Sequence, residues 1–191
     1  RSIVGIKNVS AYDFSANCSS GAGKTLYYSI TDATNHYVSV VYPGISSSNP
    51  WDGYQKPLGN IVIPNTVENG GIEYLVTGIG GSAFYGCTGL TSLTIPNSVT
   101  IMEGSAFRGC TGLTTVYWNA VNVTSYPHFV SSNPFYNCTN LSTVVFGDSV
   151  ETIPGLAFWG CSSLTSLTIG NSVTSINGSA FRGCSSLTSL D

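Results

Sequence analysis

The stretch from Leu164 to Cys184 reads LTSLTIGNSVTSINGSAFRGC, and versions of this phrase recur along most of the chain. Each version ends on a cysteine that follows Ala-Phe-x-Gly or a close variant of it. These cysteines are Cys87, Cys110, Cys138, Cys161 and Cys184, at intervals of 23, 28, 23 and 23 residues. Recurrence of a whole phrase at a nearly constant interval predicts one structural unit that repeats along the chain.

The first part of the phrase predicts a strand. Leu164, Leu167 and Ile169 alternate with Ser166 and Thr168, and such alternation indicates a short strand with one buried and one solvent-facing side. No single repeat could bury its own apolar side, so neighbouring repeats must stack into one core. A period of about 20 to 29 residues with leucine at fixed offsets is typical of leucine-rich repeats. The sequence therefore predicts a β-rich α/β solenoid, a right-handed superhelix of about 23-residue rungs.

The segment before each cysteine suits one helical or 3₁₀ turn, and in the repeat that ends at Cys184 we expect Ala180, Phe181 and Cys184 to point inward. The five repeating cysteines occupy one structural position, so they should stack, one per rung. Free cysteine is a small, readily buried hydrophobe, and we expect buried free thiols here. Disulfides between adjacent rungs are the alternative, because the spacing of neighbouring strands is compatible with disulfide geometry. Cys18 lies outside this series.

Residues 1–75 lack the repeating cysteine and are predicted to form an N-terminal β-rich cap. Strand-forming runs separated by turn residues occur at 26–31, 37–42, 60–63 and 72–77. A repeat array needs such a cap because an open first rung would expose its core. Residues 76–191 are predicted to hold about five rungs of the solenoid, one of them with a five-residue insertion within 119–134.

Two loops carry side chains that could contact a partner. The long loop of residues 43–59 contains Trp51 and Tyr54, and long loops in compact domains are often functional. The extended rung contains Tyr126, His128 and Phe129, and insertions in repeats map to loops. These five are the candidate loop contacts. The alternative is structural: the rings pin the long loop to its own domain or fill the widened rung.

Composition excludes several classes of partner. Charged residues are only 8 % of the chain, and the formal net charge is −3. The six lysines and arginines are scattered at positions 1, 7, 24, 56, 108 and 182, so we expect no basic stripe and no nucleic-acid partner. No apolar run reaches about 18 residues, so no membrane insertion is expected. The chain opens on Arg1 and its only methionine is Met102, which indicates a piece of a longer protein.

No catalytic or metal-binding constellation is evident in the sequence. His36 and His128 are far apart, and neither has metal-ligand spacing to a cysteine or carboxylate. Residues 21–25, GAGKT, resemble the end of a phosphate-binding loop but lack its upstream glycine. We therefore expect a protein that is not an enzyme, with no catalytic residue, no metal and no cofactor.

The phrase Ala-Phe-x-Gly-Cys after Val-x-x-Ile, with LTSLTIPNSV between successive copies, resembles the BspA-like leucine-rich-repeat family of bacterial surface proteins. The resemblance covers roughly residues 75–191, and residues 11–15 and 26–32 look like that family's N-terminal cap. It implies a secreted or cell-surface protein that adheres to host matrix proteins or other cells, with no shared catalytic residue. The long rung departs from the pattern, because Pro134 replaces alanine and Asn137 replaces glycine.

The leading functional hypothesis is a non-catalytic adhesion or recognition module, extracellular or on a bacterial cell surface. Its partner would be a host extracellular or matrix protein, or a cell-surface glycan. The candidate binding face consists of the solvent-facing side chains of the stacked strands. These are Ser92, Thr94, Thr115, Tyr117, Thr143, Val145, Ser166 and Thr168. The alternatives are a structural spacer and a glycan-binding module that uses Trp51, Tyr54 or Tyr117.

Overall fold

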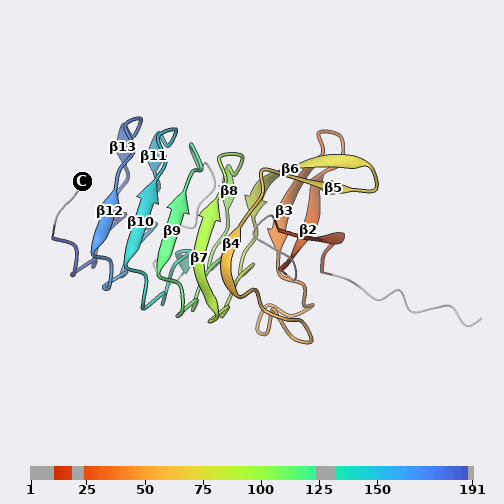
Figure 1. Cartoon of the computed structure of the whole chain (residues 1–191), viewed down its shortest axis with the longest axis horizontal. Helices are drawn as coiled ribbons and strands as arrows, with labels where there is room; N and C mark the ends of the chain where they lie inside the picture. The colour runs from red at the N-terminus through yellow and green to blue at the C-terminus, as the bar shows by residue number, and fades with distance from the viewer. Residues whose placement is uncertain (1–10, 19–23, 124–131, 189–191) are drawn as a thin grey trace, which may run out of the picture.

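The structure, a computed structural model, describes residues 11–18, 24–123 and 132–188, which form strands, turns and loops (Figure 1). The strands are β1 (Phe14–Asn17), β2 (Thr25–Asp32), β3 (Tyr37–Val41), β4 (Gly59–Val62), β5 (Thr66–Asn69), β6 (Ile72–Ile79), β7 (Leu90–Ile95), β8 (Ile101–Met102), β9 (Thr115–Trp118), β10 (Thr143–Phe146), β11 (Thr152–Ile153), β12 (Ser166–Thr168) and β13 (Ser175–Ile176). The cap sheet has the order β1-β2-β3-β6-β5, and β8 pairs with β6. The repeat sheet has the order β12-β10-β9-β7-β4, and β11 pairs with β13.

The repeat sheet is parallel, and its buried positions are in register. Leu93 of β7 pairs with Val116 of β9, which pairs in turn with Val144 of β10. Val144 then pairs with Leu167 of β12, and all four side chains are buried. Ser166, one position before Leu167, is exposed. The predicted alternation of buried and solvent-facing positions is therefore confirmed, because each repeat adds one strand in the same register.

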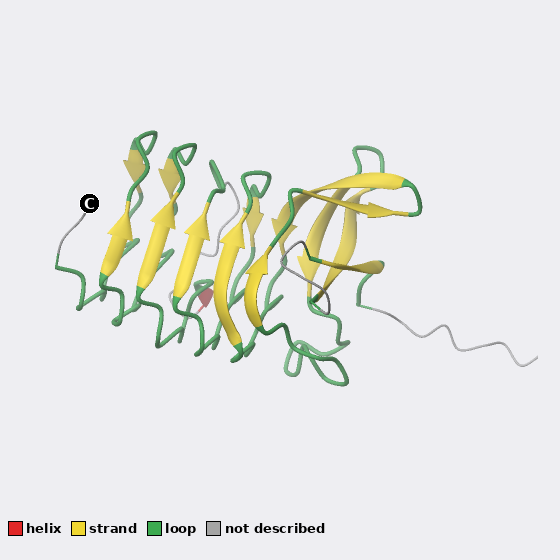
Figure 2. Cartoon of the chain, viewed as in Figure 1, coloured by secondary structure: helices red, strands yellow, loops and turns green. Residues whose placement is uncertain are grey.

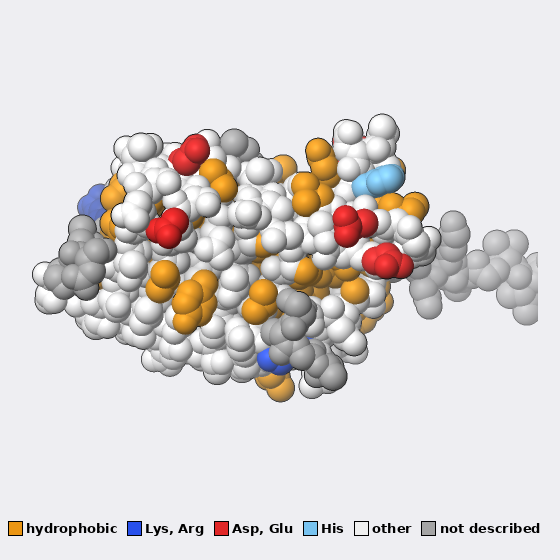
Figure 3. Space-filling view, turned by 45° about the horizontal axis from the view of Figure 1, so that its top comes forward, with side chains coloured by type: hydrophobic (Ala, Val, Ile, Leu, Met, Phe, Trp, Pro, Cys, Tyr) orange, Lys and Arg blue, Asp and Glu red, His pale blue; other side chains and the backbone are white. Residues whose placement is uncertain are grey.

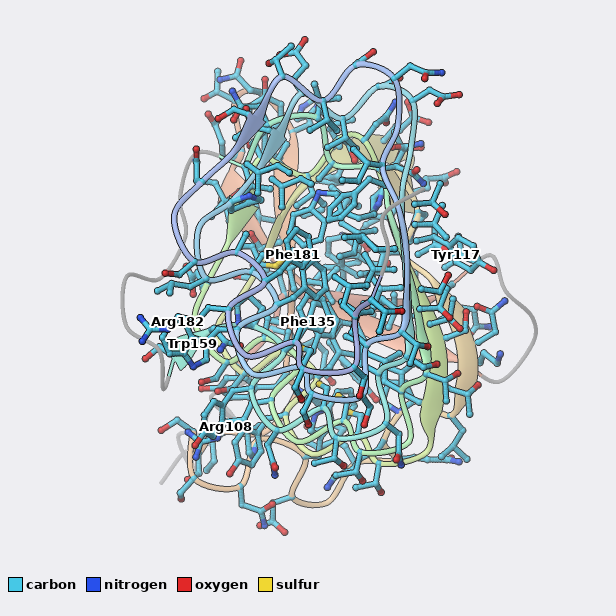
Figure 4. The ribbon with its side chains drawn as sticks, turned by 90° about the vertical axis from the view of Figure 1, so that its left-hand side faces the viewer. Arg108, Tyr117, Phe135, Trp159, Phe181 and Arg182 are labelled. Atoms are coloured by element: carbon cyan, nitrogen blue, oxygen red, sulfur yellow. The ribbon has the colours of Figure 1, made fainter. Side chains whose placement is uncertain are left out.

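A stack of phenylalanine rings runs through the core on the inner side of the repeat sheet (Figure 4). The rings are Phe84, Phe107, Phe135, Phe158 and Phe181, one from each cysteine-bearing repeat. Successive ring centroids are 5.0, 5.1, 4.9 and 5.7 Å apart, and each pair of planes lies within 16° of parallel. Trp118 and Phe146 pack against Phe158 at 6.0 and 5.9 Å. Aromatic pairs in such geometry stabilise beyond their buried area, so the stack links every rung to its neighbours.

The phrase around each phenylalanine forms hydrogen-bonded turns, and Figure 2 shows mainly strands and loops. The described residues contain no α-helix, so the fold is a β-rich leucine-rich-repeat fold and the α/β label is not confirmed. The residue before each cysteine has a left-handed φ, for example +72° at Gly109 and +62° at Asn137. A left-handed residue interrupts a right-handed helical turn. Asparagine tolerates this conformation better than most residues, which explains why it can replace glycine in the long rung.

The turns also bond one rung to the next on the side away from the repeat sheet. The N–H of Phe84 donates to the C=O of Ala106 at 2.7 Å, and the N–H of Gly86 donates to the C=O of Arg108 at 2.8 Å. The same pattern recurs between later rungs. Backbone hydrogen bonds therefore hold both sides of the array together.

The repeating cysteines are free thiols, as the sequence predicts. Those of the inner rungs are buried, whereas Cys184 is only partly buried. The thiol of Cys110 donates to the C=O of Phe84 at 3.1 Å, and that of Cys138 donates to the C=O of Phe107 at 3.2 Å. The thiols thus satisfy carbonyl groups of the preceding rung. Cys18 is buried in the cap.

The cap and the repeats interleave in the sequence. β4, within the predicted cap, is the edge strand of the repeat sheet and pairs with β7. Residues 58–67, LGNIVIPNTV, have the spacing of residues 90–99, LTSLTIPNSV, so they form a first rung that lacks the cysteine phrase beside its strand. The β5–β6 hairpin follows, and it joins the cap sheet. The predicted boundary between residues 75 and 76 therefore does not coincide with a boundary between the sheets.

Candidate binding face

The strand face of the repeat sheet carries two rows of side chains, aligned by strand pairing. The first row is Ser92, Thr115, Thr143 and Ser166. The second row is Thr94, Tyr117, Val145 and Thr168. The structure places all eight candidate residues on the solvent side, partly or fully exposed. Stacking therefore brings together side chains that are more than 70 residues apart at the extremes.

Tyr117 is the one large side chain of these two rows. It is 44 % exposed, and its partners in the row are Thr94 and Val145, which are much smaller. In Figure 4 it projects from the strand side, away from the phenylalanine stack. The ring and its hydroxyl therefore stand clear of the surrounding surface.

The strand face carries no formal charge, because none of its eight residues is acidic or basic. In the space-filling view most of the surface over the repeats is uncharged, with charged side chains only at a few points (Figure 3). Contact with this face would rest on hydrogen bonds and on the aromatic ring. Such contacts are screened little by salt, in contrast to contacts between exposed charges.

A groove of about 500 Å³ adjoins the second row at the carboxyl ends of the strands. Its lining includes Thr94 of the face and the turn residues Asn65, Asn97, Asn119 and Asp148. These four polar side chains can donate to or accept from a ligand. Sequence reasoning did not select them, although the Pro-Asn pair repeated after two strands, at 64–65 and 96–97, was a usable signal.

The two candidate residues of the cap loop, Trp51 and Tyr54, differ in exposure, but both pack against the cap. Trp51 is only 4 % exposed and packs against Tyr27 with ring centroids 6.0 Å apart, so its ring holds the loop and is not presented to a partner. Tyr54 is 38 % exposed, but it too packs against Tyr27, at 5.5 Å. Burial, and then the neighbouring Tyr54, raise the pKa of Tyr27. The geometry therefore supports the structural alternative for this loop, in which its rings hold it against its own domain.

The other three candidate loop contacts, Tyr126, His128 and Phe129, lie outside the described residues.

The buried thiols of Cys87 and Cys138 offer no reactive centre. Burial raises the pKa of Cys87 to about 12, and a hydrogen bond with the Cys110 thiol, followed by burial, raises the pKa of Cys138. A cysteine reacts as the thiolate, so these groups are held in the unreactive form. Within 11–18, 24–123 and 132–188 no cluster of three metal-binding side chains occurs. The same ranges hold no helix with the length and apolar character needed to cross a bilayer.

Comparisons with known proteins agree with this architecture. Residues 54–188 match the family model for the BspA-type leucine-rich repeat region, in six copies. A leucine-rich repeat protein of T. pallidum is similar in structure, with 25 % identity and a TM-score of 0.60 over 86 % of this chain and 67 % of that one. A leucine-rich repeat protein of Eubacterium ventriosum ATCC 27560 has 26 % identity and a TM-score of 0.55, over 86 % of this chain and 40 % of that one. No curated protein has a significantly similar sequence.

Proposed function

Because the chain belongs to the BspA-type leucine-rich repeat family, we propose that it is a non-catalytic adhesion or recognition module whose strand face contacts a partner. The partner proposed first is a host extracellular or matrix protein. The repeats would wind as a right-handed solenoid, so that each turn adds two positions to this face. This places the working surface on the repeat sheet and leaves the cap to close its first rung.

One observation carries the proposal: Tyr117 stands exposed among small, uncharged side chains, beside a groove lined with amides. Tyrosine is enriched at protein interfaces and among the residues that dominate binding energy. The hydroxyl groups around it can adapt their hydrogen bonds to different partners. A rigid ring within an adaptable polar field suits recognition of a protein surface.

The proposed location is extracellular or on a bacterial cell surface. Family membership supports it. The free cysteines are compatible with such surroundings, because burial raises the pKa of Cys87 and so suppresses the thiolate through which oxidation proceeds. The thiols therefore need no disulfide partner to persist there.

A glycan is the second candidate partner of the same face. The groove favours it, since Asn65, Asn97 and Asn119 could bond sugar hydroxyls while the Tyr117 ring packs against a sugar ring. A structural spacer, the third alternative, would bind neither class of partner.

The test is binding of the folded chain to arrays of extracellular matrix proteins and of glycans. Tyr117→Ala should weaken binding of the recovered partner by at least about 30-fold, as for a hot-spot residue. Tyr37→Ala is the matched control, because Tyr37 is 37 % exposed on β3 of the cap sheet, outside the strand face. If Tyr117→Ala leaves binding unchanged, the strand face is not the working surface. Absence of any partner on both arrays would favour the spacer.

A further inference from the structure

A second surface lies on the turn side of the array. The variable residue of each Ala-Phe-x-Gly-Cys phrase points outward there, and five rungs align these residues in a row. The arginine–aromatic row consists of Tyr85, Arg108, Tyr136, Trp159 and Arg182. In Figure 4, Arg108, Trp159 and Arg182 lie on the side of the molecule opposite Tyr117. The row is therefore distinct from the strand face.

Each guanidinium in the row stacks on an aromatic ring. Arg108 lies 5.0 Å from the Tyr136 ring centroid and 5.9 Å from that of Tyr85. Arg182 lies 4.6 Å from the Trp159 centroid. Neither arginine forms an ion pair with a carboxylate in the part of the chain that the structure describes. Stacking orders the guanidinium groups and leaves their N–H donors at the ring edges free for an anion.

A third cation extends the row. The Lys56 ammonium donates to the C=O of Gly86 at 3.0 Å, next to Tyr85. Three of the four described cationic side chains therefore lie along this one line. The fourth, Lys24, lines a pocket together with Lys56 and bonds the C=O of Asn60 in β4. In a chain with a formal net charge of −3, this concentrates positive charge on one side of the array.

A cavity interrupts the row. It has a volume of about 240 Å³ and is lined by Tyr136 and Trp159, together with the polar side chains of Asn137, Thr139 and Ser162. Both lining rings carry an arginine stacked over them. The cavity thus combines aromatic surface, hydroxyl and amide groups, and positive charge at either side.

We propose that the arginine–aromatic row binds an acidic polysaccharide. The carboxylate or sulfate groups of the polymer pair with Arg108, Arg182 and Lys56, and a sugar ring enters the cavity between Tyr136 and Trp159. Guanidinium groups bond carboxylate and sulfate oxygens with two parallel N–H donors. Equivalent positions repeat once per rung, which suits a polymer whose charged units also repeat.

The backbone of the row favours a polysaccharide over a peptide strand. The Gly86 N–H already donates to the Arg108 C=O, and the Gly109 N–H donates to the Tyr136 C=O at 3.0 Å. These backbone groups already bond one rung to the next. The row therefore offers no open edge to which a peptide could add as a strand. Recognition must therefore use side chains, and these match acidic sugars.

The experiment titrates the folded chain with polygalacturonate, with dextran as the neutral polymer and polyglutamate as the acidic peptide. Polygalacturonate should bind, dextran should not, and polyglutamate should bind clearly more weakly. The Arg108→Gln/Arg182→Gln double variant should weaken polygalacturonate binding by about tenfold or more, the loss expected when charge-assisted contacts are removed. Raising the salt concentration should also weaken binding, because these charges are exposed.

Three controls separate the proposal from its rivals. Lys24→Gln removes a charge that bonds β4 and stacks on no ring of the row, and it should change binding less than about twofold. Tyr117→Ala should leave polygalacturonate binding intact, so this proposal and the strand-face proposal fail independently. Thermal unfolding reports whether each variant folds. Equal losses from Lys24→Gln and the double variant, equally tight binding of polyglutamate, or loss of stability with unchanged binding would each overturn the proposal.

Discussion

The inner rungs and the last described rung carry the same phrase but are buried to different extents. Phe107 and Cys110 are fully buried, whereas Phe181 and Cys184 are only partly buried. Phe107 stacks on rings at both of its faces, at 5.0 and 5.1 Å. Phe181 stacks on Phe158 at one face, at 5.7 Å, and meets Phe146 edge to face at 6.3 Å.

This difference shows where burial comes from in a repeat array. The local sequence is almost unchanged between the two rungs, so the local sequence cannot be the cause. The neighbouring rung supplies the second side of the core, and stability is a sum of such neighbour contacts. Effects that depend on neighbours should therefore differ between the two rungs, and effects that depend only on the local backbone should not.

The largest difference is expected for the phenylalanines. Phe107→Ala should lower the free energy of unfolding by about 3–5 kcal/mol, because it empties a packed aromatic site. Phe181→Ala should cost about 1–2 kcal/mol, since part of the ring is already exposed. Denaturant titration of both variants measures the two losses. Equal losses would contradict the neighbour account of burial.

The glycine before the cysteine should be required both in an inner rung and in the last described one, because it has a left-handed φ in each. Gly160 has φ +74° and Gly183 has φ +82°, and a β-carbon at Gly160 would meet no atom within 4 Å. Gly160→Ala should cost about 1–2 kcal/mol from the left-handed backbone alone. Gly183→Ala should cost at least as much, because its β-carbon would also lie 3.3 Å from the Cα atom of Gly160. Gly160→Asn should cost less, as Asn137 adopts the same conformation naturally.

Gly178→Ala is the control for these glycines, because Gly178 has open space and no left-handed φ. It should be within about 0.5 kcal/mol of neutral. Thermal or denaturant unfolding decides the matter. If alanine is tolerated at position 160 as well as at position 178, the left-handed φ does not explain why glycine precedes the cysteine.

Because the inner thiols are buried, the free energy of unfolding should fall at alkaline pH. The pKa of Cys87 is raised by burial to about 12, so above its ordinary value near 9 the unfolded chain ionises while the folded chain does not. The stabilising contribution of the neutral Cys87 thiol is fully present below pH 9, and it is lost as the pH rises toward 12. Between pH 8 and pH 10 the wild type should lose about 1.4 kcal/mol more than Cys87→Ala.

Cys184→Ala is the comparison for this pH effect, because burial raises the pKa of the partly exposed Cys184 thiol as well. Its pH-dependent difference from wild type should be smaller than that of Cys87→Ala. Urea titrations at pH 8 and pH 10 give both differences. A larger effect at Cys184 would reverse the order of burial inferred for the two rungs.

The smallest effect concerns the surface hydrogen bonds between rungs. The Thr114 hydroxyl donates to the C=O of Thr91 at 3.1 Å, and Thr165 makes the equivalent bond to Ser142 at 3.3 Å. Thr114→Val should cost about 0.5–1 kcal/mol, the usual net value of one such bond. Thr91→Val, at an exposed position, is the matched control and should be nearly neutral. Equal losses would mean that the bond contributes nothing.

Prediction from sequence succeeded for the features that follow from the spacing of residues within and between repeats. Alternation in Leu164–Ile169 predicted the buried and solvent-facing sides, and the repeating cysteines predicted free thiols. It failed where a unit departs from the phrase. The run at residues 60–63 was predicted as a strand of the cap, whereas β4 belongs to the repeat sheet. The β5–β6 hairpin separates β4 from the next cysteine phrase, so a search based on cysteine did not assign Ile61 to the repeats.

The sequence by itself determined the repeating strand, the inward phenylalanine and the uncharged strand face, because each follows from residue spacing within one repeat. Tertiary structure decided what no single repeat contains. It buried Trp51 against Tyr27, it assembled the amide-lined groove from four turns, and it stacked Arg108 on Tyr136, 28 residues away. The physical reason is that these contacts form only between rungs or between distant segments, whose approach is set by packing of the shared core.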